Sequence, residues 1–346
     1  MTSSETTSPE TAVKAFFGEA RLVIPGFLLA LTVAAAAGFV SDHYGGPVML
    51  LALLIGIALA FLSEGPKVGP GVKFSSKKIL RIGVALLGLR IAYSDVVGLG
   101  GGVVALVLAG IAITIAAALL TSRFLSEPGR LGTLIGGATA ICGASAALAI
   151  SSVLPREKDH ERNTIFTVVA VTTLSTVAMV LYPAIFKAIG FTDREVGILI
   201  GATIHDVAQV VGAGYAVSEE AGDTATIVKL MRVAMLLPTV LLISLLFAQA
   251  RKASNQGEKT ELPIPGFAIA FAILVIVNSF GLVPDGLREV LIELSRWCLI
   301  TAVAAVGLTT SLRDIAKVGW HPIAIAVTAT VILLIFCVII LSMHLV

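Results

Sequence analysis

Long apolar runs separated by short polar stretches dominate the chain from residue 22 to its end. Runs of about 20 apolar residues are typical of membrane-spanning helices. Because these runs are continuous rather than alternating, they favour helices over the strands of a membrane barrel. The pattern predicts an all-α polytopic membrane protein with ten or eleven transmembrane helices. The eleven candidate spans are roughly 22–40, 47–63, 77–94, 100–122, 131–153, 163–189, 195–217, 225–248, 264–282, 287–310 and 320–345.

The polar segments are short and predict one transmembrane domain, residues 22–346, after an N-terminal segment of residues 1–21. The longest polar loop covers residues 250–262, which leaves no room for a soluble domain of useful size. The N-terminal segment has mixed charge, unlike the basic start of a signal peptide. We therefore expect the first apolar run to be retained as a helix.

Composition narrows the class of protein further. The chain is 57% hydrophobic and 13% charged, with a net charge of +2, whereas soluble domains are about 25% charged. These values argue against a soluble enzyme and against a nucleic-acid partner. The three cysteines, Cys142, Cys298 and Cys337, have unrelated spacings, so we expect no zinc site and no disulfide framework. No nucleotide-binding motif is present, and we expect no cofactor.

The distribution of Lys and Arg predicts the orientation in the membrane. With eleven spans, sixteen of the 24 Lys and Arg lie on the side of the N-terminus and four on the other side. Loops rich in Lys and Arg stay in the cytoplasm. We expect the N-terminus inside the cell, the C-terminus outside, and the chain in a bacterial inner membrane.

Two segments repeat in the sequence. Residues 84–100 and 303–319 align without gaps and are identical at six of seventeen positions, including Asp95 and Asp314. They lie seven predicted helices apart and so in opposite orientations, as in the inverted repeats of secondary transporters. Chance similarity between two helices rich in Gly and Leu is the alternative. We expect both aspartates to be structural caps or loop anchors rather than coupling sites.

A weaker pair, residues 137–145 and 201–209, shares Gly, Ala and Thr. With eleven spans these two segments run parallel, whereas inverted repeats are antiparallel. Either one segment is not a simple span, or the two are not related by symmetry.

Small residues cluster at 132–151 and predict a break in a helix at Cys142, Gly143, Ala144 and Ser145. A break inside a membrane is tolerated where the freed backbone lines a polar cavity. The N-terminus of the following half-helix would then attract an anion. Close helix packing through small residues is an equal alternative. Thr139, Cys142, Gly143 and Ser145 are the candidate substrate-binding residues here.

His205 and Asp206 lie inside an apolar run, with Gln209 one turn beyond. A charge at the centre of a bilayer costs about 2.5–3.5 kcal/mol on insertion scales. The pair therefore predicts a coupling site for protons or a cation, and Gln209 a substrate contact. A packing pair that joins two helices is the alternative.

Lys229 and Arg232 lie three residues apart near the predicted start of the eighth span. They are candidates for binding an anionic substrate or for neutralising Asp206. The alternative is that both side chains reach out to the membrane surface. The same alternative is favoured for Arg90 and Arg296.

Three strings are distinctive: residues 136–147, 204–214 and 228–233. Together they resemble the YeiH family of bacterial membrane proteins, a resemblance that covers the chain from about residue 20 to its end. The resemblance implies export of sulfate. The family is distantly similar to cation/proton antiporters and bile-acid symporters, which implies inverted repeats with discontinuous helices. Unlike those proteins, this chain has one helix after residue 314, so no second crossing helix follows.

The sequence thus predicts a secondary active transporter, not an enzyme, that moves a small anion such as sulfate, sulfite or a sulfonate. Protons or Na⁺ are the expected coupling ions, and we expect the protein to lie in the lipid bilayer. A cation/proton antiporter with Asp206 as its site is the main alternative. A passive channel is disfavoured because no filter-like repeat is present. Cys142 with His205 is the only pair suggesting an intramembrane enzyme. Whether the chain forms a homo-oligomer stays open.

Overall fold

The computed structural model describes residues 9–155, 159–248, 266–310, 319–343 and 345. Within these ranges every regular element is a helix and no strand occurs, which confirms the all-α prediction. The predicted loop at 250–262 and Asp314 lie outside the described residues. So do residues 311–318 of the second copy of the 84–100 repeat.

By length and apolar composition, the described residues contain six helices able to cross a membrane. These support a multi-pass membrane protein. The predicted spans 131–153 and 195–217 are not among them, and neither of the two is a single crossing, as described below. The six are α1 (Pro9–Tyr44, apolar from Arg21), α6 (Gly100–Phe124), α9 (His160–Ile189), the pair α12 (Glu219–Ala234) and α13 (Leu236–Leu246), α16 (Asp285–Thr309) and α18 (Trp320–Ser342).

The chain divides into two compact units. The first comprises residues 1–83 and 296–310 and contains α1, α2 (Val48–Ala58), η1 (Ala60–Glu64), α3 (Gly69–Phe74), η2 (Ser75–Ile79) and part of α16. Gly307 lies against α2: a Cβ added to it would lie 2.4 Å from the carbonyl oxygen of Leu53. Glycine at this position therefore allows two helices to approach closely, as small residues do in membrane proteins.

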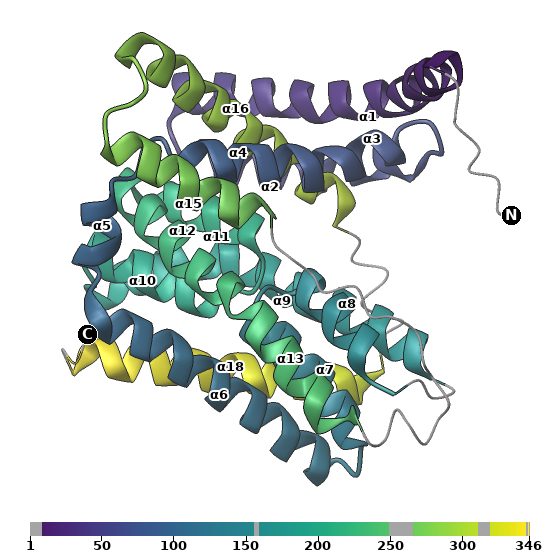
Figure 1. The fold of residues 1–346 in the computed structure, drawn as a ribbon, viewed down its shortest axis with the longest axis vertical. Coiled ribbons are helices and arrows are strands. Elements are labelled where there is room, and N and C mark those ends of the chain that lie inside the picture. Colours follow the sequence, from purple (N-terminus) through teal and green to yellow (C-terminus); the bar gives the residue numbers. More distant parts are fainter. Residues whose placement is uncertain (1–8, 156–158, 249–265, 311–318, 344, 346) are drawn as a thin grey trace, which may run out of the picture. The chain divides into compact units, whose positions relative to one another are not determined.

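The second unit comprises residues 84–295 and 311–346. In it α6 packs on α7 (Gly129–Ala140) and α18, and α12 packs on α10 (Asp193–Thr203) and α11 (Val207–Val217) (Figure 1). It also contains α8 (Ala144–Val153), α5 (Tyr93–Gly98) and α15 (Gly266–Ser279). α4 (Leu80–Leu87) begins in the first unit and ends in this one. Asp95 accepts a hydrogen bond from the backbone N–H of Ala92 at 2.8 Å, which confirms it as a cap of α5.

The segment 131–153, predicted as one span, is a hairpin of two short helices. α7 ends at Ala140 and α8 begins at Ala144. Arg130, at the start of α7, and Pro155, after the end of α8, line the same pocket. Both ends of the hairpin therefore lie at the same end of the unit, and the prediction of a single crossing here is wrong.

The segment 195–217 is a second hairpin, made of α10 and α11. The Ser218 hydroxyl, which follows α11, hydrogen-bonds to the carboxylate of Asp193 at the start of α10. This hairpin therefore also returns to the end from which it started, and its predicted single crossing is wrong as well.

The two hairpins enter from opposite ends of the second unit. They are connected by α9, which has 30 residues and is therefore about 45 Å long. We call the open end of each hairpin, where its first helix begins and its second helix ends, the mouth of that hairpin. α9 begins beside the mouth of the first hairpin and ends four residues before the start of the second hairpin (Figure 1). The related segments 137–145 and 201–209 consequently run antiparallel, which removes the geometric conflict between them.

Candidate functional site

The tips of the two hairpins meet inside the second unit. The first tip is the break 141–143 and the second is the break 204–206. A Cβ added to Gly143 would lie 3.7 Å from the His205 carbonyl oxygen and 3.8 Å from the Asp206 Cβ. Gly143 has φ +61° and ψ −122°, a backbone conformation open to glycine alone. The break predicted at Cys142–Ser145 is confirmed, beginning one residue earlier.

Arg232 of α12 binds the C-terminal ends of both incoming helices, α7 and α10. The last carbonyls of a helix have no partner within it. The guanidinium nitrogens of Arg232 donate to five such oxygens at 2.7–3.2 Å. They are the carbonyls of Thr139, Ala140, Gly201, Ala202 and Ile204. One cation thus satisfies two helix ends that each carry about half a negative charge.

Lys229 lies one turn earlier on α12 and binds the breaks themselves. Its ammonium donates to the carbonyl oxygens of Ile141 (2.7 Å), Ile204 (3.0 Å) and His205 (2.5 Å). An ammonium has three N–H groups, so these contacts use all of them. Lys229 therefore joins the two tips through their backbones.

Both cations lie deep in the unit rather than at its surface. Lys229 is 0% exposed and Arg232 2%. α12 begins at Glu219, so they lie about 15 and 20 Å along the helix from its first residue. The alternative in which their side chains reach the membrane surface is wrong, because the helix begins six residues before the predicted span.

The second tip carries the titratable residues singled out in the sequence. Buried His205 lies 2.9 Å from the Thr330 hydroxyl of α18 through its Nε2. The backbone N–H of Asp206, the half-buried residue before α11, donates to Ser175 of α9 at 3.0 Å. The Gln209 amide donates to Thr176 at 3.3 Å.

The N-termini of the outgoing helices, α8 and α11, have no side-chain cap from Gly143 or Asp206. Ser145 is exposed in the first turn of α8, and Cys142 is buried beside it. Buried Thr139 Oγ1, His205 Nδ1 and Gln209 Oε1 have no hydrogen-bond partner among the described residues. Buried polar atoms are normally satisfied by protein, water or a ligand.

The structure thus brings every sequence-predicted site residue to the two tips or to the segment of α12 that binds them. Sequence reasoning missed the partners Ser175, Thr176 and Thr330. Ser175 and Thr176 were detectable as adjacent hydroxyl residues inside an apolar run, whereas Thr330 carries no comparable signal. Among the described residues, no three His, Cys, Asp or Glu side chains are grouped to hold a metal.

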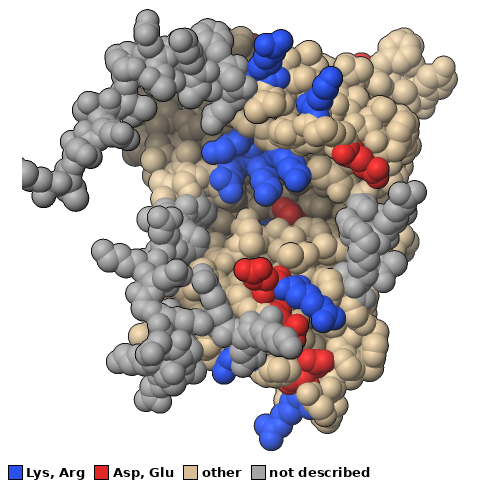
Figure 2. Space-filling model, turned by 90° about the vertical axis from the view of Figure 1, so that its right-hand side faces the viewer, with Lys and Arg blue, Asp and Glu red and all other residues tan. Residues whose placement is uncertain are grey.

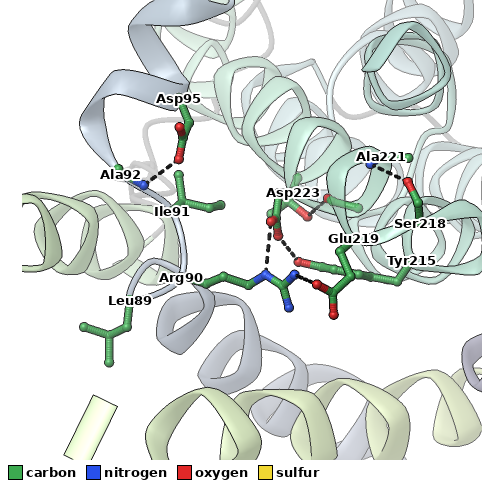
Figure 3. Close-up of polar contacts among 12 residues, drawn as sticks. Leu89, Arg90, Ile91, Ala92, Asp95, Tyr215, Ser218, Glu219, Ala221 and Asp223 are labelled. Carbon is green, nitrogen blue, oxygen red and sulfur yellow. Dashed lines mark hydrogen bonds and ion pairs between the residues drawn. The ribbon is translucent and has the colours of Figure 1, made fainter. Parts of the chain in front are cut away.

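A second polar cluster surrounds Arg90, near the mouth of the second hairpin (Figure 3). Its guanidinium binds Glu219 at 2.5 Å and Asp223 at 3.0 Å, both on α12. The Tyr215 hydroxyl of α11 donates to the same Asp223 carboxylate. The cluster fixes the chain after α4 to the corner between α11 and α12. Arg90 is therefore ion-paired rather than directed to the membrane surface. Arg296 is exposed.

Substitution of Arg90 by alanine is expected to lower the free energy of unfolding by about 1–3 kcal/mol, because it leaves the largely buried Asp223 without its cation. Thermal unfolding of the purified protein in detergent measures the effect. Glu219→Gln is the matched control, since that side chain is 80% exposed and exposed pairs contribute about 0–1 kcal/mol. Equal unfolding temperatures for Arg90→Ala and the wild type would contradict this role.

The mouth of the second hairpin is also held by charge. The Lys187 ammonium donates to Asp193 at 2.7 Å. This contact with Lys187 is the main reason why the pKa of Asp193 lies below its ordinary value, and the hydrogen bond from Ser218 is the second reason. The Asp193 carboxylate therefore stays ionised at neutral pH and keeps the two ends of the hairpin together.

Comparison with known proteins extends over nearly the whole chain. The family model described as conserved hypothetical protein 698 matches residues 25–326. The UPF0324 membrane protein TauZ of Paracoccus denitrificans is 52% identical over 313 residues, which cover 90% of this chain and 93% of that protein. The UPF0324 inner membrane protein YeiH of Escherichia coli strain K12 is 35% identical over 314 residues, 88% of this chain and 89% of that protein.

Proposed function

The chain belongs to the family of conserved hypothetical protein 698, and from this premise and the charges at the hairpin tips we propose that it is a secondary active transporter of a small anion. The resemblance to YeiH is confirmed by the same comparison. The observation that supports the proposal best is the meeting of two uncapped helix N-termini beside two buried cations. No chemical conversion of the anion is part of the proposal.

The local charge favours an anion. Lys229 and Arg232 supply two positive charges, the C-termini of α7 and α10 offset about one, and the N-termini of α8 and α11 add about one. With Asp206 ionised, the tips carry a net charge of about +1, and with Asp206 protonated about +2. A cation would meet repulsion in either state, whereas a sulfate-like dianion is best matched when Asp206 is protonated.

The first-turn N–H groups of α8 and α11 are the proposed direct donors to the anion, with Ser145, Thr139 and Gln209 as side-chain contacts. Cys142 and Gly143 shape the first tip. Lys229 and Arg232 act indirectly in this proposal, because their N–H groups bind backbone carbonyls. They keep the tips together and set the positive potential. His205 and Asp206 are the proposed coupling residues for protons.

The hairpins also change the proposed membrane topology. Two hairpins in place of two spans leave nine crossings, with the N-terminus still inside and the C-terminus still outside. Lys187 and Arg194 then lie outside the cell, and Arg156, Lys158 and Arg162 inside. The distribution of Lys and Arg becomes seventeen to three, a stronger bias than before. Alternating access would come from movement of one unit against the other.

Counterflow in proteoliposomes tests the proposal. Vesicles loaded with unlabelled sulfate or sulfite should accumulate the labelled anion with saturation, and an imposed pH gradient should change the extent. Protein-free liposomes are the control. Absence of counterflow with sulfate, sulfite and a sulfonate would overturn the assignment of a small sulfur oxyanion.

Cation/proton antiport is the second candidate, and the half-buried Asp206 at the second tip favours it. A carboxylate that alternates between a proton and Na⁺ would move protons when Na⁺ is added. A pH-sensitive dye inside the same vesicles measures this exchange. Proton movement on addition of Na⁺, together with no anion counterflow, would favour antiport over anion transport.

A further inference from the structure

The amide of Gln209 has a fixed orientation in the first turn of α11. Gln209 is the third residue of that helix and is 3% exposed. Its Nε2 donates to the Thr176 hydroxyl oxygen of α9 at 3.3 Å. The single proton of that hydroxyl is already used, since Thr176 donates to the Thr172 carbonyl oxygen at 3.0 Å. Thr176 therefore accepts from the amide nitrogen, and the Gln209 Oε1 is left as an acceptor for another group.

The Gln209 Oε1 has no donor among the described residues, although it is buried. Helical side chains lean toward the N-terminus of their helix, so this oxygen lies beside the first turn of α11. Asp206, the residue before α11, places a second acceptor there, because side chains at these two positions lie close together. The start of α11 thus offers backbone N–H donors together with a buried acceptor that lacks a partner.

The hydroxyl of Thr139 is a further buried group without a partner among the described residues. Threonines within helices commonly donate to the carbonyl four residues earlier. Thr203, at the equivalent place in the second hairpin, does so to Leu199 at 2.6 Å, whereas Thr139 does not. Arg232 binds the carbonyls of Thr139 and Ile204, so Thr139 lies near the second tip. Its hydroxyl is therefore available to a ligand at the tips.

The buried cations leave these groups to make the direct contacts with a substrate. Figure 2 shows Lys and Arg side chains and, near them, Asp and Glu side chains on an outer face of the molecule. Lys229 and Arg232 are buried instead, and their N–H groups bind backbone carbonyls. They attract an anion through their charge, whereas hydrogen bonds to the anion are left to the starts of α8 and α11 and to the side chains beside them.

An oxyanion without hydrogen, such as sulfate, has acceptor oxygens alone. It would pair with the backbone N–H groups and leave the Gln209 Oε1 without a donor, which a buried site disfavours. We propose that the substrate of the tips is an oxyanion that carries its own hydrogen-bond donor, an –OH or –NH₂ group, and gives it to the Gln209 Oε1. The oxygens of the anion accept from the N–H groups of α8 and α11 and from Thr139. This inference rests on the proposed function, because it specifies the anion bound at the same tips.

Sulfamate and methanesulfonate are the probes that test this inference. Both are tetrahedral monoanions of nearly equal size at neutral pH, and they differ by an –NH₂ group in place of –CH₃. Each is titrated at constant ionic strength into the full-length protein, purified in detergent. The rise in unfolding temperature with concentration gives an apparent dissociation constant for each anion.

Three variants separate the role of the amide from that of its surroundings. Gln209→Met keeps the length of the side chain and removes the acceptor. Thr176→Val removes the partner that fixes the orientation of the amide, so that either side of the amide can face the anion. Thr172→Val is the matched control, because it makes the same change one turn away on α9, where the hydroxyl donates to the Val168 carbonyl at 2.7 Å.

Sulfamate is expected to bind at least about tenfold more tightly than methanesulfonate to the wild type and to Thr172→Val, the effect of one hydrogen bond to a buried acceptor. The ratio of the two dissociation constants should fall to about one in Gln209→Met and to an intermediate value in Thr176→Val. If Gln209→Met does not fold, Thr176→Val decides the question, since valine has the shape of threonine.

Equal affinity of the wild type for the two anions would overturn the inference and leave the proposed anion site intact. It would show that water, and not the substrate, pairs with the Gln209 Oε1. A preference for sulfamate that persists in folded Gln209→Met and Thr176→Val proteins would overturn it as well, because the donor would then bind elsewhere. Absence of binding by both anions would remove the inference together with the proposed anion site.

Discussion

Substitution of Arg232 by leucine is expected to prevent folded protein from accumulating. Arg232 is the donor to the carbonyl oxygens of Thr139, Ala140, Gly201 and Ala202. Leaving four buried acceptors unpaired costs roughly 4–12 kcal/mol, at about 1–3 kcal/mol each. That is comparable with the whole stability of a typical domain, about 5–15 kcal/mol. Leucine also removes the charge opposite two helix C-termini.

The measurement is the amount of monodisperse protein after detergent extraction, followed by its unfolding temperature. Arg232→Lys keeps the charge but has three N–H groups in place of five, so its unfolding temperature should lie between those of Arg232→Leu and the wild type. Arg123→Leu removes an exposed arginine and should behave as the wild type. A monodisperse Arg232→Leu protein with the wild-type unfolding temperature would disprove the capping role.

The hairpins show why part of the fold escaped prediction from the sequence. An apolar segment of 23 residues, such as 131–153, is long enough to cross a bilayer, and nothing local distinguishes a crossing from a return. The count of Lys and Arg did not expose the error either. Moving Lys187 and Arg194 to the outside and three basic residues to the inside leaves the bias strong in both topologies.

The local features of the candidate site were easier to predict from the sequence than the hairpins were. Gly143 and its small neighbours predicted a break, and the structure confirms it, because the combination of φ +61° and ψ −122° at Gly143 is open to glycine alone. Polar residues inside apolar runs identified His205, Asp206, Lys229 and Arg232. The partners of Lys229 and Arg232 could not be predicted from the sequence, because both side chains bind backbone carbonyls, which any sequence would provide. A buried cation in the sequence therefore indicates a polar environment without revealing whether a substrate or a helix end supplies it.

The antiparallel hairpins give the weaker repeat a physical meaning. Residues 137–145 and 201–209 each end one helix and begin another, and α12 binds both in the same way. In each, a helix C-terminus faces the buried cations and a helix N-terminus begins on the other side of the break. Two such tips double the field that one broken helix would provide, which is the basis of the proposed anion site.

Asp206→Asn is expected to abolish anion accumulation driven by a pH gradient while leaving exchange of labelled for unlabelled anion intact. Asparagine keeps the size of the side chain but carries no charge and takes up no proton. The tips then hold a net charge of about +2 at every pH, as they do in the wild type with Asp206 protonated. Anion binding therefore persists, and its link to proton movement is lost.

Both activities are measured in the same proteoliposomes, with sulfate as the first anion tested. Asp285→Asn is the matched control, because Asp285 is exposed at the start of α16 and far along the chain from the tips. It should accumulate the anion as the wild type does. Gradient-driven accumulation by Asp206→Asn with unchanged pH dependence would show that Asp206 is not the coupling residue. Loss of exchange as well, in a protein that remains folded, would instead place Asp206 among the groups needed for binding. That result would favour a cation at the second tip, since a carboxylate repels an anion and attracts Na⁺.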